Sequence, residues 1–319
     1  MYKKIKLVLS LFLVVTIALG QQQNKSSFNV VPLGIKGGID ESNLSCYLVA
    51  PSGTNDFVAF DAGTINAGIE KAIEKTTFSV LLTTVLKNYI KGYFISHAHL
   101  DHVSGLIINS PADATKTVYA TEKCMKMMED HYFNGETWAN FGDEGPGFQI
   151  KKYHFQTLNL AEKTVVTNTT MTVQAYSLSH VNPFESTAFL LKNNKDYVLY
   201  LGDTGADRIE KSDKLTSLWK TIAPLIKNNE LKGIFIEVSF PNDQPDNQLY
   251  GHLTPSLLSQ ELESLSKYTG KQALKNFNII ITHVKPPSDK IALLKEQLIE
   301  SNPFQVHYVF PEQGVQFEL

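Results

Sequence analysis

Three histidines and one aspartate fall within six residues of this chain, in the run His97-Ala98-His99-Leu100-Asp101-His102. The apolar residues just before this run predict a strand that carries the cluster at its end. Imidazole and carboxylate groups are the usual protein ligands of zinc and related metals. His97 and His99 are two residues apart, so on an extended loop both side chains point to one side and can bind one ion. Asp101 and His102 are offset from them and can begin a second site.

Three more potential ligands follow predicted strands elsewhere in the chain, namely His180, Asp203 and His283. Ligands held on loops at the end of a sheet are what a rigid binding site requires. Taken alone, each histidine is explained at least as well as a hydrogen-bonded structural residue. The run at 97–102 has too few donors for two ions, however, and this favours all three as ligands. The carboxylate of Asp203 has two oxygens and can bridge two ions.

Apolar periodicity predicts the elements that position these residues. In the first half, strands are expected at 28–33, 45–50, 56–61, 91–96 and 118–120, and helices at 66–88, from 103 onward and at 121–131. In the second half, strands are expected at 170–177, 186–191, 197–201, 233–237, 278–281 and 306–310, and helices at 213–227, 254–268 and 288–300. Two sheets packed face to face with helices outside are the natural outcome. Residues 133–147 lack periodicity, and a loop of this length is usually functional or mobile.

The first twenty residues have the layout of a secretory signal peptide, with three lysines before an apolar run and a change to polar residues at 21–24. The apolar run covers residues 7–20, which is shorter than the ~20 residues needed to span a bilayer. A cleaved signal is therefore favoured over a membrane anchor. We expect export, to the periplasm or out of the cell, and no stable membrane anchor after cleavage. Residues 21–319 would then remain as a single catalytic domain.

The negative net charge and the single arginine indicate a small substrate. Cleavage at residue 20 removes Lys3, Lys4 and Lys6 and no acid, which takes the formal charge from −3 to −6. Arg208 is the only arginine. A surface that binds polynucleotide normally needs clustered lysine and arginine, so a nucleic acid polymer is not expected as a partner.

The two cysteines leave alternatives open. Cys46 and Cys124 either pair in an oxidising compartment or remain two buried free thiols, since sequence does not show their proximity. Neither has a second cysteine nearby in the sequence, so a thiolate metal site is not expected. The oligomeric state is equally open, and a homodimer is one of the options.

The order of the donors resembles the metallo-β-lactamase superfamily: H-x-H-x-D-H, then a strand-end His, a Gly-Asp and a final strand-end His. Residues 97–111, which include Leu100, Gly105 and Ser110-Pro111, also resemble the signature of the class II cyclic-nucleotide phosphodiesterases at all fifteen positions. Shorter similarities are Gly37-Gly38 with Asn43, and the segments 60–63, 138–141, 202–205 and 251–255. The resemblance thus extends from about residue 30 to 315.

This resemblance implies an α+β fold, the metallo-β-lactamase-like αββα sandwich of two mixed sheets, with two divalent ions, preferably Zn²⁺, at one edge. The resemblance implies that the first ion is bound by His97, His99 and His180, and the second by Asp101, His102 and His283. Asp203 would bind both ions. Asp61, at the first strand-end acid of the superfamily, would orient ligands rather than bind metal. The implied reaction converts cyclic AMP, with cyclic GMP as a second candidate, into the nucleoside 5′-monophosphate.

In the implied mechanism, two adjacent divalent ions lower the pKa of a shared water toward neutrality and make a bridging hydroxide nucleophile. Attack on phosphorus expels the ribose 3′ oxygen, which needs a proton. His252 is the candidate acid, and Glu237, which ends the preceding strand, would fix its tautomer and hold it charged. The transfer-RNA-processing phosphodiesterases of the superfamily have a similar Glu–His pair. A helix-capping or surface role is the alternative for His252, and Asp101 counts among both the metal-binding and the catalytic residues.

Recognition of the base is assigned to the irregular segment. Trp138 and Phe141 can stack on a purine, and Asn140 and Asn43 are further candidates for substrate contact. A lid packed onto the core explains the same segment equally well. Arg208 either reaches a phosphate or, as the commoner role, forms a surface salt bridge.

Three other hydrolases of the same fold are alternatives: an RNA-processing phosphodiesterase, a lactonase and a β-lactamase. The acidic balance and the expected export argue against RNA. Hydrolysis of a lactone or β-lactam needs no separate leaving-group acid of the Glu237–His252 kind. A protein that only binds metal or ligand is a further alternative, but it is hard to reconcile with a complete set of seven donors.

Overall fold

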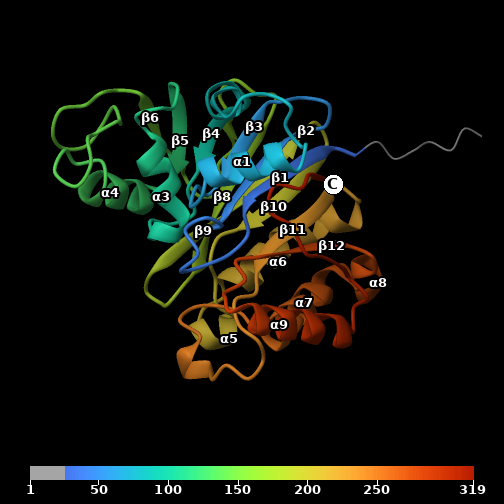
Figure 1. Cartoon of the computed structure of the whole chain (residues 1–319). Helices are drawn as coiled ribbons and strands as arrows, with labels where there is room; N and C mark the ends of the chain where they lie inside the picture. The colour runs from blue at the N-terminus through green and yellow to red at the C-terminus, as the bar shows by residue number, and fades with distance from the viewer. Residues whose placement is uncertain (1–25) are drawn as a thin grey trace, which may run out of the picture.

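The computed structural model describes residues 26–319, so the signal peptide expected at 1–20 lies outside the described residues. Residues 26–319 form two mixed seven-stranded sheets that face each other, with helices on the outer face of each (Figure 1). The arrangement is the αββα sandwich expected from the sequence. Within the described part of the chain, no helix is both long enough and apolar enough to cross a bilayer.

The first sheet comes from the first half of the chain, with β14 added from the C-terminal end, and has the strand order β14-β1-β2-β3-β4-β5-β6. Its first strands pair antiparallel and its later ones parallel. The strands are β1 (Phe28–Gly34), β2 (Cys46–Pro51), β3 (Phe57–Phe60), β4 (Ile90–Phe94), β5 (Lys116–Ala120), β6 (Tyr153–Thr157) and β14 (Phe317–Glu318). The helices of this half are α1 (Asn66–Glu74), α2 (Leu82–Thr84), α3 (Leu100–Asn109) and α4 (Glu122–His131), with a π-helical turn at Val85–Tyr89.

The second sheet repeats this plan with the order β13-β12-β11-β10-β9-β8-β7. Here too an antiparallel meander leads into parallel strands. The strands are β7 (Thr164–Val165), β8 (Thr172–Ser179), β9 (Glu185–Asn193), β10 (Asp196–Leu201), β11 (Leu231–Glu237), β12 (Asn278–Thr282) and β13 (His307–Val309). The helices are α5 (Asp207–Glu210), α6 (Lys214–Lys227), α7 (Pro255–Thr269), α8 (Lys271–Leu274) and α9 (Ser288–Glu300), with a 3₁₀ turn at Asp246–Gln248.

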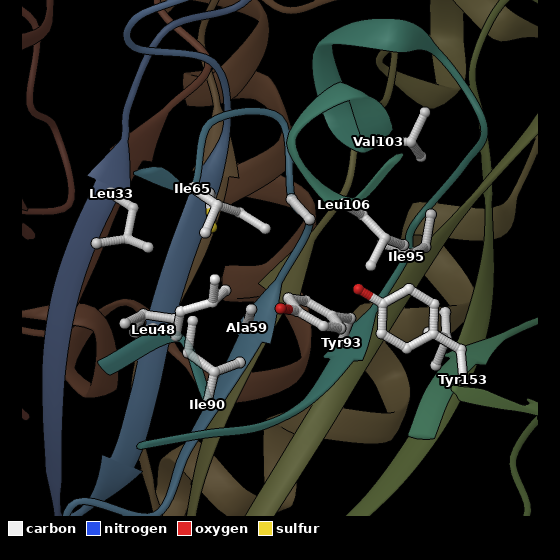
Figure 2. Close-up of a cluster of buried hydrophobic side chains, with 14 of the residues drawn as sticks. Leu33, Leu48, Ala59, Ile65, Ile90, Tyr93, Ile95, Val103, Leu106 and Tyr153 are labelled. Atoms are coloured by element: carbon white, nitrogen blue, oxygen red, sulfur yellow. The ribbon is translucent and has the colours of Figure 1, made fainter. Parts of the chain in front are cut away.

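Both faces of the central strands are buried, which explains their continuous apolar runs. In and just after β4, Tyr93 and Ile95 pack under the helices of the first half (Figure 2), whereas Phe94 points into the layer between the sheets. There the ring of Phe94 stacks on Tyr119 with centroids 4.6 Å apart. Each large apolar side chain buried in this way contributes roughly 1.5–3 kcal/mol. One apolar layer lies between the sheets, and one lies beneath the helices of each half. Together these layers hold the strand ends, and the loops that follow them, in fixed positions.

The structure corrects the long helix expected at 66–88. Helix α1 ends at Glu74, and Thr76 has a left-handed φ of 61° that turns the chain back. This reversal buries Phe78 against Phe57, with ring centroids 5.8 Å apart, so tertiary packing overrides the helical periodicity. Strands β6, β7 and β14 were not predicted. The alternation of buried and exposed residues in Tyr153–Thr157 is the signal that could have found β6.

Candidate metal centre

The predicted ligands come together because they all follow strands that end at one edge of the sandwich. His97 follows β4, His180 follows β8, Asp203 follows β10 and His283 follows β12. His99 is the N-cap of α3, so Asp101 and His102 lie in the first turn of that helix. A negative charge in the first helical turn is favourable because it faces the positive end of the helix dipole.

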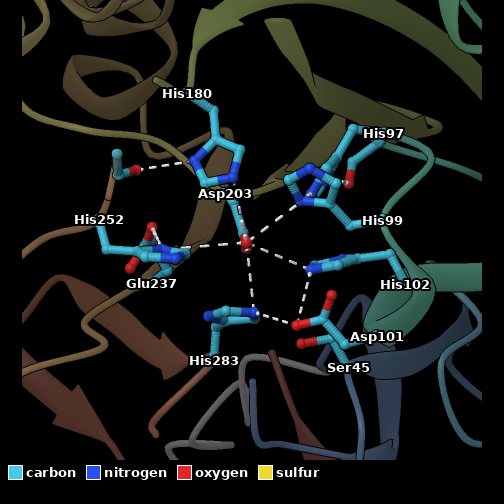
Figure 3. Close-up of polar contacts among 12 residues, drawn as sticks. Ser45, His97, His99, Asp101, His102, His180, Asp203, Glu237, His252 and His283 are labelled. Carbon is cyan, nitrogen blue, oxygen red and sulfur yellow. Dashed lines mark hydrogen bonds and ion pairs between the residues drawn. The ribbon is translucent and has the colours of Figure 1, made fainter. Parts of the chain in front are cut away.

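Asp203 lies at the centre of the cluster (Figure 3). Its Oδ2 atom is surrounded by four Nε2 atoms, at 3.8 Å from His97, 3.3 Å from His102, 3.9 Å from His180 and 3.2 Å from His283. Two separate triads of donors have all their ligand atoms within 4.8 Å of one another: His97, His99 and His180, and Asp101, His102 and His283. One carboxylate therefore lies between two groups of potential ligands.

The outer nitrogens of these imidazoles are all occupied, which determines the tautomers. Nδ1 of His102 contacts Asp61 Oδ2 at 2.7 Å, and Nδ1 of His180 contacts the Gly251 carbonyl oxygen at 2.9 Å. Because these oxygens accept, both Nδ1 atoms donate, and both Nε2 atoms face Asp203. An imidazole whose far N–H is held by an acceptor is the arrangement typical of metal-binding histidines.

Two serine hydroxyls hold the outer nitrogens of the other two imidazoles, those of His97 and His283. Ser96 Oγ donates to Asp61 Oδ2 at 2.9 Å and lies 3.0 Å from Nδ1 of His97, so it accepts from that nitrogen. Ser239 Oγ donates to Glu237 Oε2 at 2.7 Å and lies 3.0 Å from Nδ1 of His283. The Nε2 lone pairs of both histidines are thereby directed into the cluster as well.

Asp61 is buried beneath the site and belongs to none of the donor groups of the described residues. Besides His102 and Ser96, its Oδ2 accepts a 2.7 Å hydrogen bond from the hydroxyl of Tyr200, which comes from the opposite sheet. Asp61 itself adopts a left-handed φ of 55°, as does His283. Non-glycine residues in this conformation are uncommon and concentrate at functional sites, where the surrounding structure holds them.

The electrostatics of the cluster favour an additional positive charge. Burial raises the pKa of Asp203, but His283 and His102 outweigh it, and the pKa lies well below its usual range. Burial lowers the pKa of His102, but Asp203, Asp61 and Asp101 outweigh it and raise that pKa well above its usual range. Burial also lowers the pKa of His99 to about 4, with help from His180 and His102. These shifts favour an ionised Asp203 and a positive charge beside it, whether a proton on His102 or a bound ion.

The donor set fits a divalent metal ion. Nε2 of His102 is buried and has no hydrogen-bond partner although it lies 3.3 Å from Asp203 Oδ2, which is costly unless another group engages this nitrogen. Neutral imidazoles together with ionised carboxylates are the ligands that zinc and related divalent ions take in proteins.

Glu237 and His252 form the expected pair at the border of the cluster. Glu237 is the last residue of β11. Its Oε1 accepts from Nδ1 of His252 at 2.7 Å and from the backbone N–H of Thr204, and its Oε2 accepts from the backbone N–H of Leu253. Nε2 of His252 accepts from the ammonium of Lys285 at 2.8 Å. Burial lowers the pKa of His252 to about 3, and Lys285 also opposes its protonation. The imidazole is therefore neutral in this structure, which corrects the expectation that Glu237 keeps it charged.

Comparison with known proteins identifies the family. The model of the class-II cAMP phosphodiesterases matches residues 27–307, which include every residue of the cluster. The chain belongs to this family. It is 42% identical over 303 residues to a 3′,5′-cyclic-nucleotide phosphodiesterase of Aliivibrio fischeri, covering 90% of this chain and 92% of that protein. It is 36% identical over 316 residues to a probable 3′,5′-cyclic-nucleotide phosphodiesterase of Yersinia pestis, covering 94% of this chain and 92% of that protein.

Solved structures agree on the fold. Unliganded yeast PDE1 superimposes with a TM-score of 0.81 at 24% identity, covering 92% of this chain and all of that one. The metallo-β-lactamase fold protein YhfI from Bacillus subtilis superimposes with a TM-score of 0.61 at 15% identity, covering 91% of this chain and 99% of that one. The family and the fold predicted from the sequence are therefore confirmed, and the chain is a class-II phosphodiesterase, a hydrolase of phosphodiester bonds.

Most of the substrate contacts predicted for this phosphodiesterase are structural instead. Phe141 is buried in the first-half core, so it has no free face for a base. The amide of Asn140 bonds to backbone atoms of its own loop, at Gly142, Glu144 and Pro146. Asn43 Oδ1 accepts from the Ile35 N–H and supports the loop that carries Gly37-Gly38. Trp138 is 36% exposed, its Nε1 donates to Ser110, and its contact with a base stays a prediction.

The remaining candidates have ordinary roles. Arg208 forms an exposed ion pair with Asp246 at 3.2 Å, the commoner of the two roles expected for it. Cys46 and Cys124 are both buried free thiols. Sequence reasoning missed Ser239, Tyr200 and Lys285. For Ser239 and Lys285 the available signal was their position two residues after a candidate site residue, whereas nothing in the sequence points to Tyr200.

Proposed function

We propose that this phosphodiesterase hydrolyses 3′,5′-cyclic AMP, with cyclic GMP as a second substrate, to the nucleoside 5′-monophosphate. The proposal is carried by the family match over residues 27–307, together with the name of the relative from Aliivibrio fischeri. The match includes the whole donor cluster, so the chemistry as well as the fold is expected to be shared.

We further propose that the site binds two zinc ions. His97, His99 and His180 would hold one, Asp101, His102 and His283 the other, and Asp203 both, which agrees with the two donor triads on either side of its carboxylate. When bound, such a pair of ions supplies a water-derived nucleophile at neutral pH and neutralises charge on the phosphoryl oxygens. Asp61, Ser96 and Ser239 orient the imidazoles and hold their tautomers.

In the reaction, a new bond forms between the attacking oxygen and phosphorus, and the bond from phosphorus to the ribose 3′ oxygen breaks. The 3′ oxygen gains a proton, and His252 is our candidate to deliver it. Glu237 holds Nδ1 of His252, so Nε2, which accepts from Lys285 in this structure, is the atom that would deliver the proton. The imidazole is neutral at rest, so the negative charge of the bound phosphodiester must favour protonation of Nε2.

The alternatives have weaker support. The described surface carries its only arginine in an ion pair with Asp246, and the formal charge is negative, so a polynucleotide substrate is disfavoured. The family match and the names of the relatives point to cyclic nucleotides and give no support to a β-lactam or lactone substrate.

The test is a substrate panel. Purified zinc-loaded protein is given cyclic AMP, cyclic GMP, a transfer-RNA precursor and a β-lactam, and products are separated by liquid chromatography. We expect 5′-monophosphate from at least one cyclic nucleotide, and loss of that product with Asp203→Asn, which keeps the side-chain shape but removes the central charge. Absence of 5′-nucleotide from both cyclic substrates would overturn the proposal.

We also propose that the enzyme is exported after removal of residues 1–20. The support is the basic start, the short apolar run and the polar residues that follow. N-terminal sequencing of the protein recovered outside the cytoplasm is the test. A chain that still begins with Met1 would contradict cleavage.

A further inference from the structure

Lys285 lies at the border of the cluster, in the loop that follows β12, two residues after His283. Its Nζ is 2.8 Å from Nε2 of His252 and 5.4 Å from the ring centroid of Phe240. Its backbone N–H is bound by the carbonyl oxygen of Ser239 at 3.3 Å. Both ends of this residue are thus held by the segment between β11 and α7, which also carries His252.

The ammonium of Lys285 has no acidic partner among residues 26–319, where its hydrogen-bond acceptor is Nε2 of His252. Lysines nearby behave differently: Lys36 pairs with Asp40 at 2.8 Å, and Lys290 pairs with Asp243 at 2.6 Å. The side chain of Lys285 is partly buried. A partly buried cation without a counter-ion is costly, and an anion that binds beside it regains that cost.

His252 directs this cation. Glu237 holds Nδ1 of the imidazole, so Nε2 points to Lys285 and accepts one of the three ammonium hydrogens. Two N–H donors of Lys285 remain for another acceptor. The imidazole is also 3.9 Å, through its Nδ1, from Oδ2 of Asp203, so the ammonium is held at the border of the donor cluster.

We infer that Lys285 binds the phosphoryl group of the cyclic nucleotide and that His252 positions it, an inference that rests on the proposed function. The substrate diester carries one negative charge, and the phosphoryl oxygens gain more as attack proceeds. An ammonium held in advance at that place stabilises this charge without reorganisation. Lysine suits the task because it binds phosphate as a point charge.

The experiment compares Lys285→Met, Lys285→Gln and Lys285→Arg with Lys290→Met, a matched lysine on the exposed start of α9. Turnover of cyclic AMP is measured together with inhibition by 5′-AMP and by adenosine, which differ only in the phosphate. Bound zinc and thermal unfolding are recorded for each variant. The glutamine variant retains a hydrogen-bond donor for His252 and lacks the charge, so it isolates the electrostatic contribution.

We expect Lys285→Met and Lys285→Gln to lower kcat/KM roughly 10- to 100-fold and to weaken inhibition by 5′-AMP about tenfold, as for loss of a charge-assisted hydrogen bond. Inhibition by adenosine and the zinc content should not change, Lys285→Arg should recover part of the loss, and Lys290→Met should match the wild type. Equal weakening of 5′-AMP and adenosine, or loss of zinc, would make Lys285 structural and overturn the inference. Wild-type activity in both variants would also overturn it, whereas an inactive wild type would refute the proposed function instead.

Discussion

The hydroxyl of Tyr200 offers a direct test of how the two sheets cooperate at the metal centre. It comes from β10 in the second sheet and donates to Oδ2 of Asp61, which follows β3 in the first. Burial and the neighbouring Asp61 raise the pKa of Tyr200 well above its usual range, so the hydroxyl keeps its hydrogen and donates it. The same Oδ2 atom accepts from His102, one of the expected ligands.

Tyr200→Phe removes this donor and little else. The ring stacks on Phe60 with centroids 4.9 Å apart and an interplanar angle of 4°, and this packing does not need the oxygen. A hydrogen bond to a buried charged group contributes about 1.5–3 kcal/mol. At roughly 2–4 °C per kcal/mol for a chain of this size class, the midpoint of thermal unfolding should fall by several degrees. Because Asp61 orients His102, zinc affinity should fall roughly tenfold or more.

The assay pairs calorimetric unfolding with zinc titration against a chromophoric chelator. Tyr197→Phe is the matched control, since Tyr197 lies three residues earlier in β10 and is only partly buried. It should leave both readouts unchanged. If Tyr200→Phe binds zinc as tightly as the wild type, Asp61 does not need the second sheet to orient its histidine, and the reasoning fails.

Four further outcomes follow from the same geometry. Chelation should abolish hydrolysis and lower the unfolding midpoint, and zinc should restore both, because the clustered ionised acids need a cation at their centre. His252→Ala should lower turnover ~100-fold or more with full metal content, and unchanged turnover would exclude the acid role. In metal-free protein the folded-state pKa of His252 is about 3 against a usual 6.5, so the unfolded chain binds more protons between these values. Stability should therefore decrease as pH falls, by about 2 kcal/mol at pH 5, and His252→Gln should remove this contribution in denaturant titrations. Gly37→Ala should displace His283, since its Cβ would lie 2.1 Å from that ring, and a zinc stoichiometry equal to wild type would contradict this.

Much of the site was predictable because its residues stand where sequence signals are strongest. Runs buried on both faces mark the strands, and polar residues that follow each run within a few positions lie at the sheet edge. His97, His180, Asp203 and His283 were found in this way and do converge. The match over 97–111 then pointed to the family, which the comparisons confirm.

The parts that failed depend on packing that the local sequence does not contain. Phe141 has the composition of a base-stacking residue but is buried in the first-half core. The helix expected at 66–88 breaks because burial of Phe78 outweighs local periodicity. The charge state of His252 depends on burial and on Lys285, which reaches it across 33 positions of the chain.

By itself, the sequence determined which chemistry is available: the residue types, their order and their place after apolar strands define a metal-binding hydrolase of a particular family. Only the tertiary structure decided how those groups act, because tautomer, charge and direction are set by neighbours distant in the chain. Tyr200 reaches Asp61 from the opposite sheet, Ser239 and Glu237 orient His283, and Lys285 faces His252. Hydrogen bonds and Coulomb interactions act over a few ångströms, and it is the packing of the two sheets that brings these groups within that range.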